Sequence, residues 1–441
     1  MSGARPAPMR YQVALVVGAV VLALLAGGLA LVLSQLPDVG STPALRIGIG
    51  IVLGFLVVLI IRYFVLLWLG YLQHLEAKLT SYPEVDEPVT ILVPAYNEGP
   101  VIESAVRSLL DLDYGAYEIL VIDDGSTDDT YARASALEGR YGRVTVRVVS
   151  KANAGKASAL NTGIALARHD FVLCMDGDSR LDRGTLRSAM RHFTDERIGA
   201  VAGNVKVVNR DTLWTRLQAL EYIEGLNMAR RAQGFLRSVN VIPGPIGIFR
   251  RRTLLDVGGY DTDTYAEDAD LTLKVLTAGW QVVYEDGAIA YTEAPESLLD
   301  LIKQRYRWTR GILQALRKRA GWLVLPRGGT GVWLSLLAML FEAIVWPVVN
   351  VLGNLFFVIA ALQAGAAEQV AYWWLLLTLL DVAAALHTVA MEEEELWLVP
   401  YAILYRFFFI VLIDVAKLFA TAEEFMNVRM TWGKLERAGR I

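Results

Sequence analysis

The sequence predicts an α/β domain inserted between membrane-spanning helices, and three observations support this architecture. Hydrophobic residues make up 54% of the 441 residues, while charged residues make up only 20%. The charged residues concentrate between Glu76 and Arg319, and both flanks are nearly apolar. Strand-like and helix-like patterns alternate within the charged range, which is typical of a sheet covered by helices. The expected units are two membrane helices at 1–80, the α/β domain at 81–297, interface helices at 298–326 and further membrane or interface helices at 327–441.

Two apolar runs precede the α/β domain. Tyr11–Leu36 carries no charge and is long enough to span a bilayer. A secretory signal would be shorter, and here a second apolar run, Ile47–Leu72, follows at once. This second run contains Arg62, which we expect to face protein or to extend to the membrane surface. The sequence therefore predicts two N-terminal spans.

Three apolar runs follow the α/β domain, at Gly331–Leu362, Val370–Ala390 and Leu396–Ala420. Five simple spans would place the basic tail Arg429–Arg440 outside the cell, against the usual positive-inside bias. If Gly331–Leu362, which contains Pro347, lies partly along the interface, four spans cross and the tail stays inside. The sequence leaves both topologies open.

Four apolar stretches in the α/β domain predict buried strands, and helical patterns separate them. Because continuous apolar strands are usual in parallel sheets, we expect a mostly parallel sheet covered on both faces. Ligands of such sheets lie beyond the carboxyl ends of the strands, which is where the polar motifs fall. The predicted strands are Val89–Val93, Tyr117–Ile122, Val144–Val149 and Phe171–Met175, and the predicted helices include Val101–Leu110 and Ala157–Ala167.

The polar motifs fit the needs of a nucleotide-sugar site, which must hold a base, a diphosphate and a cation. Asp176-Gly177-Asp178 follows the fourth predicted strand. Two carboxylates two positions apart can hold Mg²⁺ or Mn²⁺, which also binds phosphate oxygens. The same triplet is common in surface turns, so its position at a strand end is what favours a metal site.

Two further motifs offer contacts for the nucleotide. Asp124 lies in Asp123-Asp124-Gly125-Ser126 at the end of the second strand and is better explained as an acceptor for uridine than as a helix cap. Ser126, in contrast, has the position of a cap. Lys156 lies where a helix begins, and a cation beside free backbone N–H groups suits a phosphate or a pyrimidine. A solvated lysine is the alternative.

Glu267-Asp268 comes shortly before a helical run and supplies candidate catalytic acids. Ordinary acidic residues at a helix start would look the same. Displacement at an anomeric carbon needs a carboxylate that removes the acceptor's proton, and we assign Asp268 to this role, with Glu267 beside it. No covalent intermediate is needed, so we expect inversion.

A basic stretch, Leu301–Arg319, contains seven lysines and arginines and no acid. This composition predicts an amphipathic helix at a membrane surface. Within it, Arg307 can pair with a leaving diphosphate, and Trp308 can stack on an acceptor sugar. Gln304 belongs to the same Gln304-Arg305-Tyr306-Arg307-Trp308 segment.

Taken in this order and spacing, the motifs resemble those of processive family 2 glycosyltransferases, which include cellulose, chitin, hyaluronan and poly-N-acetylglucosamine synthases. The similarity covers Val89–Arg319 and begins with Pro94-Ala95-Tyr96-Asn97-Glu98. It implies a Rossmann-like GT-A fold. The chain's size, its two leading spans and the tail Thr431-Trp432-Gly433-Lys434 are most similar to the poly-β-1,6-N-acetylglucosamine synthase branch.

The resemblance also implies roles for single residues on the donor side. Tyr96 would stack near the uracil, and Glu98, Asp124 and Lys156 would bind the uridine. Asp178 would bind the metal with Asp176 beside it.

On the acceptor side, the resemblance implies that Asp268 is the base and that Pro243-Gly244-Pro245 lines the acceptor site. The threonine that usually precedes the two acids in this family is Ala266 here, and we expect little consequence from the missing hydroxyl. The implied acceptor and diphosphate element consists of Gln304, Arg307 and Trp308.

The function expected from these observations is polymerisation of a sugar, N-acetylglucosamine by preference, from a UDP-sugar into an extracellular polysaccharide, with coupled export. The expected partners are the UDP-sugar donor, the growing polysaccharide, membrane lipid and a small membrane accessory subunit. A net charge of −4 gives no support for nucleic-acid binding. The catalytic domain is expected on the cytoplasmic side of the cell membrane, and the single cysteine, Cys174, excludes an intrachain disulfide.

Alternatives remain at this point. A non-processive transferase acting on a lipid acceptor would share most of the motifs. A transporter with a nucleotide-binding domain would need Walker-type glycine spacing, which the sequence lacks. Polar residues in the C-terminal runs either bond helix to helix or line a path for sugar hydroxyls. They are Glu342, Asn350, Asn354, Asp381, His387 and Asp414.

Overall fold

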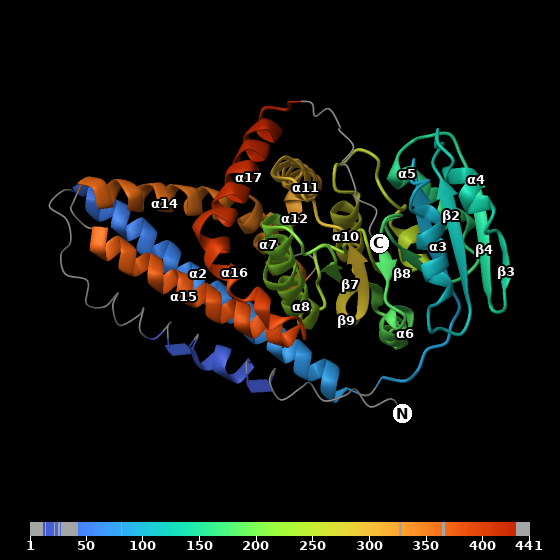
Figure 1. Cartoon of the computed structure of the whole chain (residues 1–441), viewed down its shortest axis with the longest axis horizontal. Helices are drawn as coiled ribbons and strands as arrows, with labels where there is room; N and C mark the ends of the chain where they lie inside the picture. Colours follow the sequence, from blue (N-terminus) through green and yellow to red (C-terminus); the bar gives the residue numbers. More distant parts are fainter. Residues whose placement is uncertain are drawn as a thin grey trace.

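A computed structural model gives the architecture of the chain (Figure 1). The first predicted span, Tyr11–Leu36, lies largely outside the described residues, and the tail Arg429–Arg440 lies wholly outside them. The structure describes residues 43–80, 82–325, 329–363 and 367–428, together with part of 12–27.

The described strands of the α/β domain form a single nine-stranded sheet in the order β3-β4-β2-β1-β5-β8-β7-β9-β6. The strands are β1 (Val89–Ala95), β2 (Tyr117–Asp123), β3 (Gly139–Tyr141), β4 (Val144–Ser150), β5 (Phe171–Cys174), β6 (Arg180–Leu181), β7 (Ile198–Val207), β8 (Gly247–Arg250) and β9 (Gln281–Thr292). All four strands predicted from apolar runs are present as β1, β2, β4 and β5.

The sheet is mixed, which corrects the expectation of a mostly parallel one. Strands β4, β2, β1 and β5 run parallel, but β8 is antiparallel to both β5 and β7. In chain order, the short strand β8 comes after α8 and the Pro243–Pro245 loop, and it lies between β5 and β7 in the sheet.

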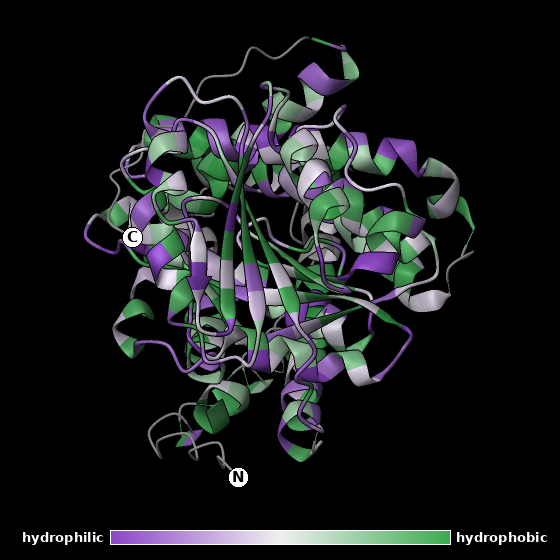
Figure 2. Cartoon of the chain, turned by 90° about the vertical axis from the view of Figure 1, so that its right-hand side faces the viewer, coloured by the Kyte–Doolittle hydropathy of each residue, from purple (hydrophilic) through white to green (hydrophobic). Residues whose placement is uncertain are grey.

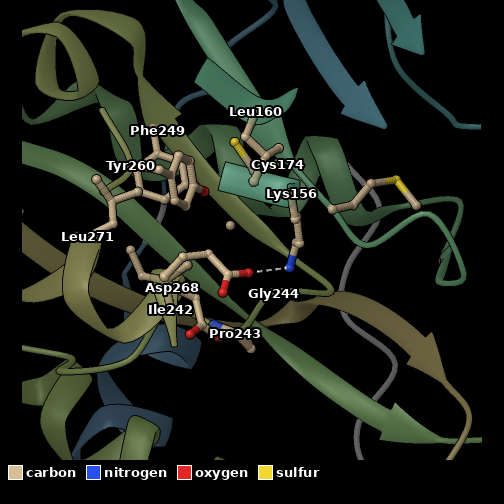
Figure 3. Close-up of a pocket in the computed structure, with 13 residues that line it drawn as sticks. Lys156, Leu160, Cys174, Ile242, Pro243, Gly244, Phe249, Tyr260, Asp268 and Leu271 are labelled. Carbon is tan, nitrogen blue, oxygen red and sulfur yellow. Dashed lines mark ion pairs between the residues drawn. The ribbon is translucent and has the colours of Figure 1, made fainter. Parts of the chain in front are cut away.

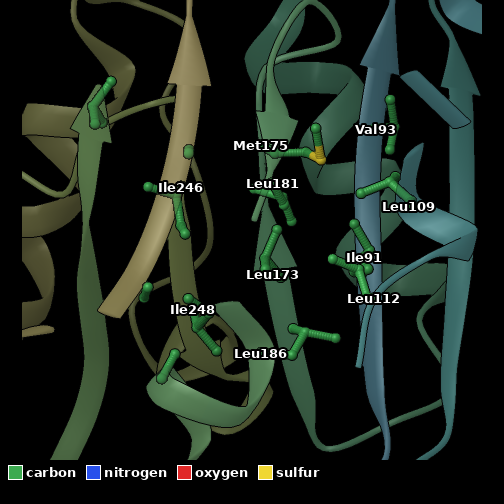
Figure 4. Close-up of a cluster of buried hydrophobic side chains, with 14 of the residues drawn as sticks. Ile91, Val93, Leu109, Leu112, Leu173, Met175, Leu181, Leu186, Ile246 and Ile248 are labelled. Carbon is green, nitrogen blue, oxygen red and sulfur yellow. The ribbon is translucent and has the colours of Figure 1, made fainter. Parts of the chain in front are cut away.

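Burial on both faces explains the central strands. Every residue of β1 and β2 is buried, as expected for strands covered on both sides. One layer of this core joins Ile91 and Val93 of β1 to Leu173 of β5, Ile248 of β8 and Leu109 (Figure 4). Hydrophobic strands are visible inside the domain, and hydrophilic segments lie on its outer loops (Figure 2).

Helices cover the sheet and connect its strands. Helix α5 lies against β1, where Gly163 packs so closely on Leu92 that an added Cβ would lie 2.9 Å from it. The helices of the domain are α3 (Ile102–Leu110), α4 (Thr130–Ser135), α5 (Lys156–Leu166), α6 (Thr185–Met190), η1 (Arg191–Thr194), α7 (Leu213–Glu221), η2 (Tyr222–Asn227), α8 (Met228–Phe235), α9 (Arg251–Asp256), α10 (Glu267–Thr277), α11 (Leu298–Lys318) and α12 (Ala320–Val324).

A helical arm extends from the α/β domain and consists of α2, α14 and α15, which contact one another (Figure 1). Among the described residues, two helical segments are long and apolar enough to cross a membrane, Val57–Leu79 and Thr330–Phe356. The four or five crossings expected from the sequence stay a prediction. The helices outside the α/β domain are α2 (Pro43–Leu79), α13 (Thr330–Leu340), η3 (Phe341–Val345), α14 (Trp346–Gln363), α15 (Ala367–Met391), η4 (Leu396–Leu398), α16 (Tyr401–Leu404), η5 (Tyr405–Phe409) and α17 (Ile410–Phe425).

Arg62 faces protein, as one of the two expectations had it. Its guanidinium lies 2.6 Å from Glu342 and 5.3 Å from the ring centroid of Trp346. Glu342 belongs to the π-helical turn η3, which the apolar pattern of this run did not predict.

Candidate active site

The Asp176-Gly177-Asp178 turn follows β5 and packs against the end of β1. A Cβ added at Gly177 would lie 2.6 Å from the carbonyl oxygen of Pro94, so a residue with a side chain cannot occupy this position without moving the backbone. The glycine therefore allows both acids to lie directly beside the carboxyl edge of the sheet.

Lys156, the first residue of α5, lies between two acids that come from distant parts of the chain. Its Nζ is 2.5 Å from Asp176 Oδ1 and 2.8 Å from Glu267 Oε1. Lys156, Glu267 and Asp268 all line one small cavity of about 10 Å³, together with Gly244 (Figure 3). The structure thus joins three motifs that the sequence analysis treated separately.

The neighbouring acids Glu267 and Asp268 at the start of α10 have different surroundings, which shift their pKa values in opposite directions. Burial and the charge of Glu267 raise the pKa of Asp268 to about 6. Burial acts in the same direction on Glu267, but the Lys156 ammonium outweighs it and lowers the pKa of Glu267. Asp268 forms no ion pair within the described residues, so it is the stronger base of the two.

The loop containing Gly244 is tied to α10 and to the Asp-Gly-Asp turn. The Ile242 amide donates to Thr272 Oγ1 at 2.9 Å, and this hydroxyl donates to the Asp268 carbonyl at 2.7 Å. A Cβ at Gly244 would lie 3.0 Å from Asp176 and 3.1 Å from Lys156 Nζ. Thr272 was missed from the sequence because a threonine inside a helix carries no signal of this contact.

Helix α11, which carries the Gln304–Trp308 element, is a neighbour of the helix that carries Glu267 and Asp268. It packs against α10, and a Cβ at Gly311 would lie 2.4 Å from both the amide nitrogen and the Cβ of Ala266. Small residues on both sides allow this approach, which accounts for alanine where the family usually has threonine. Trp308 lies near Tyr222, with 6.5 Å between the ring centroids.

Not all basic side chains of α11 face solvent, since Arg305 and Arg310 are buried. Arg305 is buried and pairs with Glu221 of α7 through two bonds of 3.1 and 2.5 Å. Its guanidinium also lies 4.3 Å from the Trp308 ring centroid. Arg310 is buried too and lies 2.8 Å from Glu424 of α17. Arg305 positions the tryptophan, a role that no local sequence pattern indicates.

The residues expected to bind uridine lie at the ends of β1 and β2. Tyr96 is 42% exposed, and Glu98 is half-buried in the loop between β1 and α3. Asp124 is buried and accepts from the amides of Ala154 and Gly155, the latter at 2.7 Å, while Lys151 lies 2.5 Å away. In this structure Asp124 therefore orders the loop that leads into α5.

Two groups of acids could be considered for a metal. Asp176 and Asp178 offer oxygen ligands of the kind that Mg²⁺ and Mn²⁺ prefer, on the turn that packs against the end of β1. The carboxylates of Asp261, Asp263 and Asp270 also converge, but Lys274, Lys318 and Arg319 pair with them. The donor set of the first group fits a divalent cation, whereas the charge of the second group is already balanced.

A family model described as "Glycosyltransferase like family 2" matches residues 87–311. This range contains the whole sheet, the acids of the cavity and most of α11.

Two relatives carry the same name, poly-β-1,6-N-acetyl-D-glucosamine synthase. The one from Staphylococcus aureus (strain COL) is 32% identical over 246 residues, which is 55% of this chain and 59% of the relative. The one from Staphylococcus epidermidis is 30% identical over 279 residues, which is 62% of this chain and 66% of the relative. The matches thus span about three fifths to two thirds of the relatives' length.

A solved structure has the same fold over most of its length. The mannosyltransferase PcManGT from Pyrobaculum calidifontis, in complex with GDP-Man and Mn²⁺, matches with a TM-score of 0.60 and 20% identity. The match covers 85% of this chain and 98% of that one. Its fold, the matched family model and the placement of the acids at the sheet edge agree, and this chain belongs to glycosyltransferase family 2.

Proposed function

We propose that this chain is an inverting transferase that adds N-acetylglucosamine from a UDP-activated donor to the end of a growing polysaccharide. The observation that carries the proposal is the partly buried cluster of Asp176, Glu267 and Asp268 around Lys156 at the carboxyl edge of the sheet. The names of the two staphylococcal relatives support the choice of sugar and product.

In this proposal, Asp268 takes the proton of the acceptor hydroxyl. A pKa of about 6 leaves its carboxylate ionised at neutral pH and makes it a stronger base than an ordinary aspartate. The deprotonated hydroxyl then attacks the anomeric carbon as UDP leaves from the opposite face. A single displacement of this kind inverts the configuration. Glu267 assists by holding the Lys156 ammonium at 2.8 Å.

On the donor side, the Lys156 ammonium and the first turn of α5 suit the diphosphate. Tyr96, Glu98 and the loop ordered by Asp124 are assigned to the uridine. Asp178, with Asp176 beside it, would hold Mg²⁺ or Mn²⁺, and the Mn²⁺ in complex with PcManGT supports a metal in this fold. A divalent cation bound there would offset the diphosphate charge.

On the acceptor side, Trp308 is assigned to stacking on the sugar at the end of the polymer, with Gln304 and Arg307 on the same helix. The fixed position of Trp308 between Arg305 and Tyr222 suits a platform that holds a chain through repeated additions. The two apolar segments support attachment of the domain to a membrane, and export through the helical arm belongs to the same proposal.

The proposal is tested by incubating the purified full-length chain in detergent with a panel of UDP-sugars and GDP-mannose, with Mg²⁺ or Mn²⁺. We expect release of UDP from UDP-N-acetylglucosamine together with long polymer, and no comparable release from the other donors. The Asp268→Asn variant supplies the background. Release of nucleotide only from another donor would refute the proposed sugar.

The length of the product decides between the proposal and a non-processive transferase. The Trp308→Ala variant should lose long polymer while keeping some hydrolysis of the donor. Single additions to a lipid acceptor by the wild-type chain, without polymer, would favour the alternative function.

A further inference from the structure

A second pocket, of about 630 Å³, lies where the segment after α15 meets α7 of the transferase domain. None of its residues takes part in the proposed sugar transfer. Its walls are formed by Arg210, Arg216, Trp397, Pro400, Tyr401 and Leu404.

Arg216 is fixed in this pocket without an acidic partner. Its Nε donates to the Arg210 carbonyl at 2.8 Å, and its Nη1 donates to the Tyr401 hydroxyl at 2.7 Å. The rings of Trp397 and Tyr401 lie 5.6 and 5.7 Å from the guanidinium. No carboxylate in the described part of the chain forms an ion pair with Arg216, so a partly buried positive charge remains uncompensated.

The neighbouring charges do not remove this excess. Glu394 is shared between Arg210 at 2.8 Å and Lys206 at 3.0 Å. Glu395 accepts from Trp397 Nε1 at 2.7 Å and lies 3.7 Å from Arg210. Both acids are therefore already bound to other groups, and the pocket keeps a net preference for an anion.

Exposed apolar side chains line the pocket, as Trp397 and Leu404 do, or belong to α7 and α16 beside it, as Leu213 and Ile403 do. Leu213, Trp397, Ile403 and Leu404 are each about two fifths exposed, at 39, 43, 43 and 40%. The pocket also lies beyond Met391, the end of α15 that faces the transferase domain (Figure 1). Arginine, tryptophan and tyrosine beside exposed aliphatic groups match the boundary between lipid headgroups and acyl chains.

We propose that this pocket binds an anionic phospholipid from the leaflet that faces the transferase domain. Arg216 would pair with the phosphate, Trp397 and Tyr401 would lie at headgroup level, and acyl chains would cover Leu404 and Ile403. The inference rests on the proposed membrane attachment, but not on the proposed sugar or on polymerisation.

The site would also act on the acceptor side of the enzyme. Arg216 lies near the start of α7, and Glu221 at the end of the same helix holds Arg305 beside Trp308. A lipid that fixes α7 therefore stabilises the platform on which the polymer is proposed to rest.

The test measures lipid binding to the purified full-length chain in neutral detergent by native mass spectrometry, with phosphatidylglycerol, phosphatidylcholine or inorganic phosphate added. We expect phosphatidylglycerol to bind more tightly than phosphatidylcholine, and millimolar phosphate not to displace it. Arg216→Gln should weaken phosphatidylglycerol binding about fivefold to tenfold, because each basic residue near an anionic surface contributes about that factor. The control Arg252→Gln, an exposed arginine on α9, should leave binding unchanged.

Arg216→Lys keeps the charge and loses the planar fork, so it should fall between the wild type and Arg216→Gln. If Arg216→Gln does not fold, Arg216→Lys alone still tests the role of Arg216 in lipid binding. Equal binding of the two lipids, full displacement by phosphate, or wild-type binding by both Arg216 variants would overturn the proposal. Since the readout is lipid retention and not sugar transfer, a failure here leaves the proposed function standing.

Discussion

Two of the acids on helix α10, Asp268 and Asp270, are two positions apart and have opposite surroundings. Asp268 lines the cavity with Glu267 and Lys156, and the Lys156 ammonium pairs with Glu267 and with Asp176. Asp270 is fully buried among cations. Arg319 lies 2.5 Å and Lys318 3.0 Å from it, and Lys318 also pairs with Asp261 and Asp263.

The difference is one of charge balance. Lys156 pairs with Asp176 and Glu267, while Asp268 forms no ion pair within the described residues and has a raised pKa, so Asp268 can still bind a proton. The second cluster has three acids and three cations, since Lys274 joins the two on α11 and at its end. A partly buried acid with a raised pKa and no ion pair among the described residues suits chemistry, whereas a cluster of balanced charge suits attachment of α10 to α11. The following predictions test this distinction.

The largest effect is expected for Asp268→Asn. The amide keeps the shape but cannot accept the proton of the acceptor hydroxyl. The rate of UDP release that accompanies polymer synthesis should therefore fall on the order of 10²–10⁴-fold. Binding of the donor, followed by isothermal titration calorimetry, should survive. Polymer synthesis near the wild-type rate would remove Asp268 from the reaction.

Removal of divalent cations should come next. Excess chelator is expected to lower turnover by on the order of a hundredfold or more, and Mg²⁺ or Mn²⁺ should restore it. Asp178→Asn should raise the metal concentration needed for half-maximal turnover, whereas Asp263→Asn in the balanced cluster should leave it unchanged. Full turnover in chelator would show that the unbalanced acids need no metal.

Asp270→Asn should affect stability and spare chemistry. It leaves Lys318 and Arg319 beside a neutral side chain in a buried site, and the expected loss of unfolding free energy is about 3 kcal/mol. Thermal denaturation in detergent measures this loss, and turnover per folded molecule should stay near the wild-type value. A large loss of turnover without destabilisation would contradict the assignment.

The smallest effect belongs to Asp263→Asn. The Asp263 side chain is 68% exposed, so solvent screens its bond to Lys318. The expected loss of stability is at most about 1 kcal/mol, and turnover should not change. If this variant destabilises the protein as much as Asp270→Asn does, then the difference in exposure between Asp263 and Asp270 does not determine their contributions to stability.

The sequence predicted the parallel half of the fold well. Strands β1, β2, β4 and β5 are buried on both faces and read as continuous apolar runs. The antiparallel pairing of β8 with β5 and β7 was missed, because the apolar pattern of a strand does not show which strands become its neighbours or in which direction they run. The π-helical turns in the C-terminal helices have no sequence pattern that would reveal them.

The candidate site was predicted as separate motifs, but their contacts were not. Asp176, Lys156 and Glu267 each follow a recognisable pattern, yet only the folded sheet brings Lys156 between the other two. Asp268 and Asp270 look alike in the sequence. What distinguishes them is Lys318 and Arg319, which come 48 and 49 residues after Asp270 and reach it through the packing of α11.

The central claim is that Asp268 is the catalytic base. The pH dependence of kcat/KM for UDP release during polymer synthesis tests this claim most directly. Asp268 must be deprotonated to act, and its pKa is raised to about 6, so the rate should rise with pH, about tenfold per unit below pH 6, and level off above about 7. Asp270→Asn should keep this profile, because that acid belongs to the balanced cluster. A rate that stays flat between about pH 5 and 8, or an acid limb that disappears in Asp270→Asn, would contradict the account.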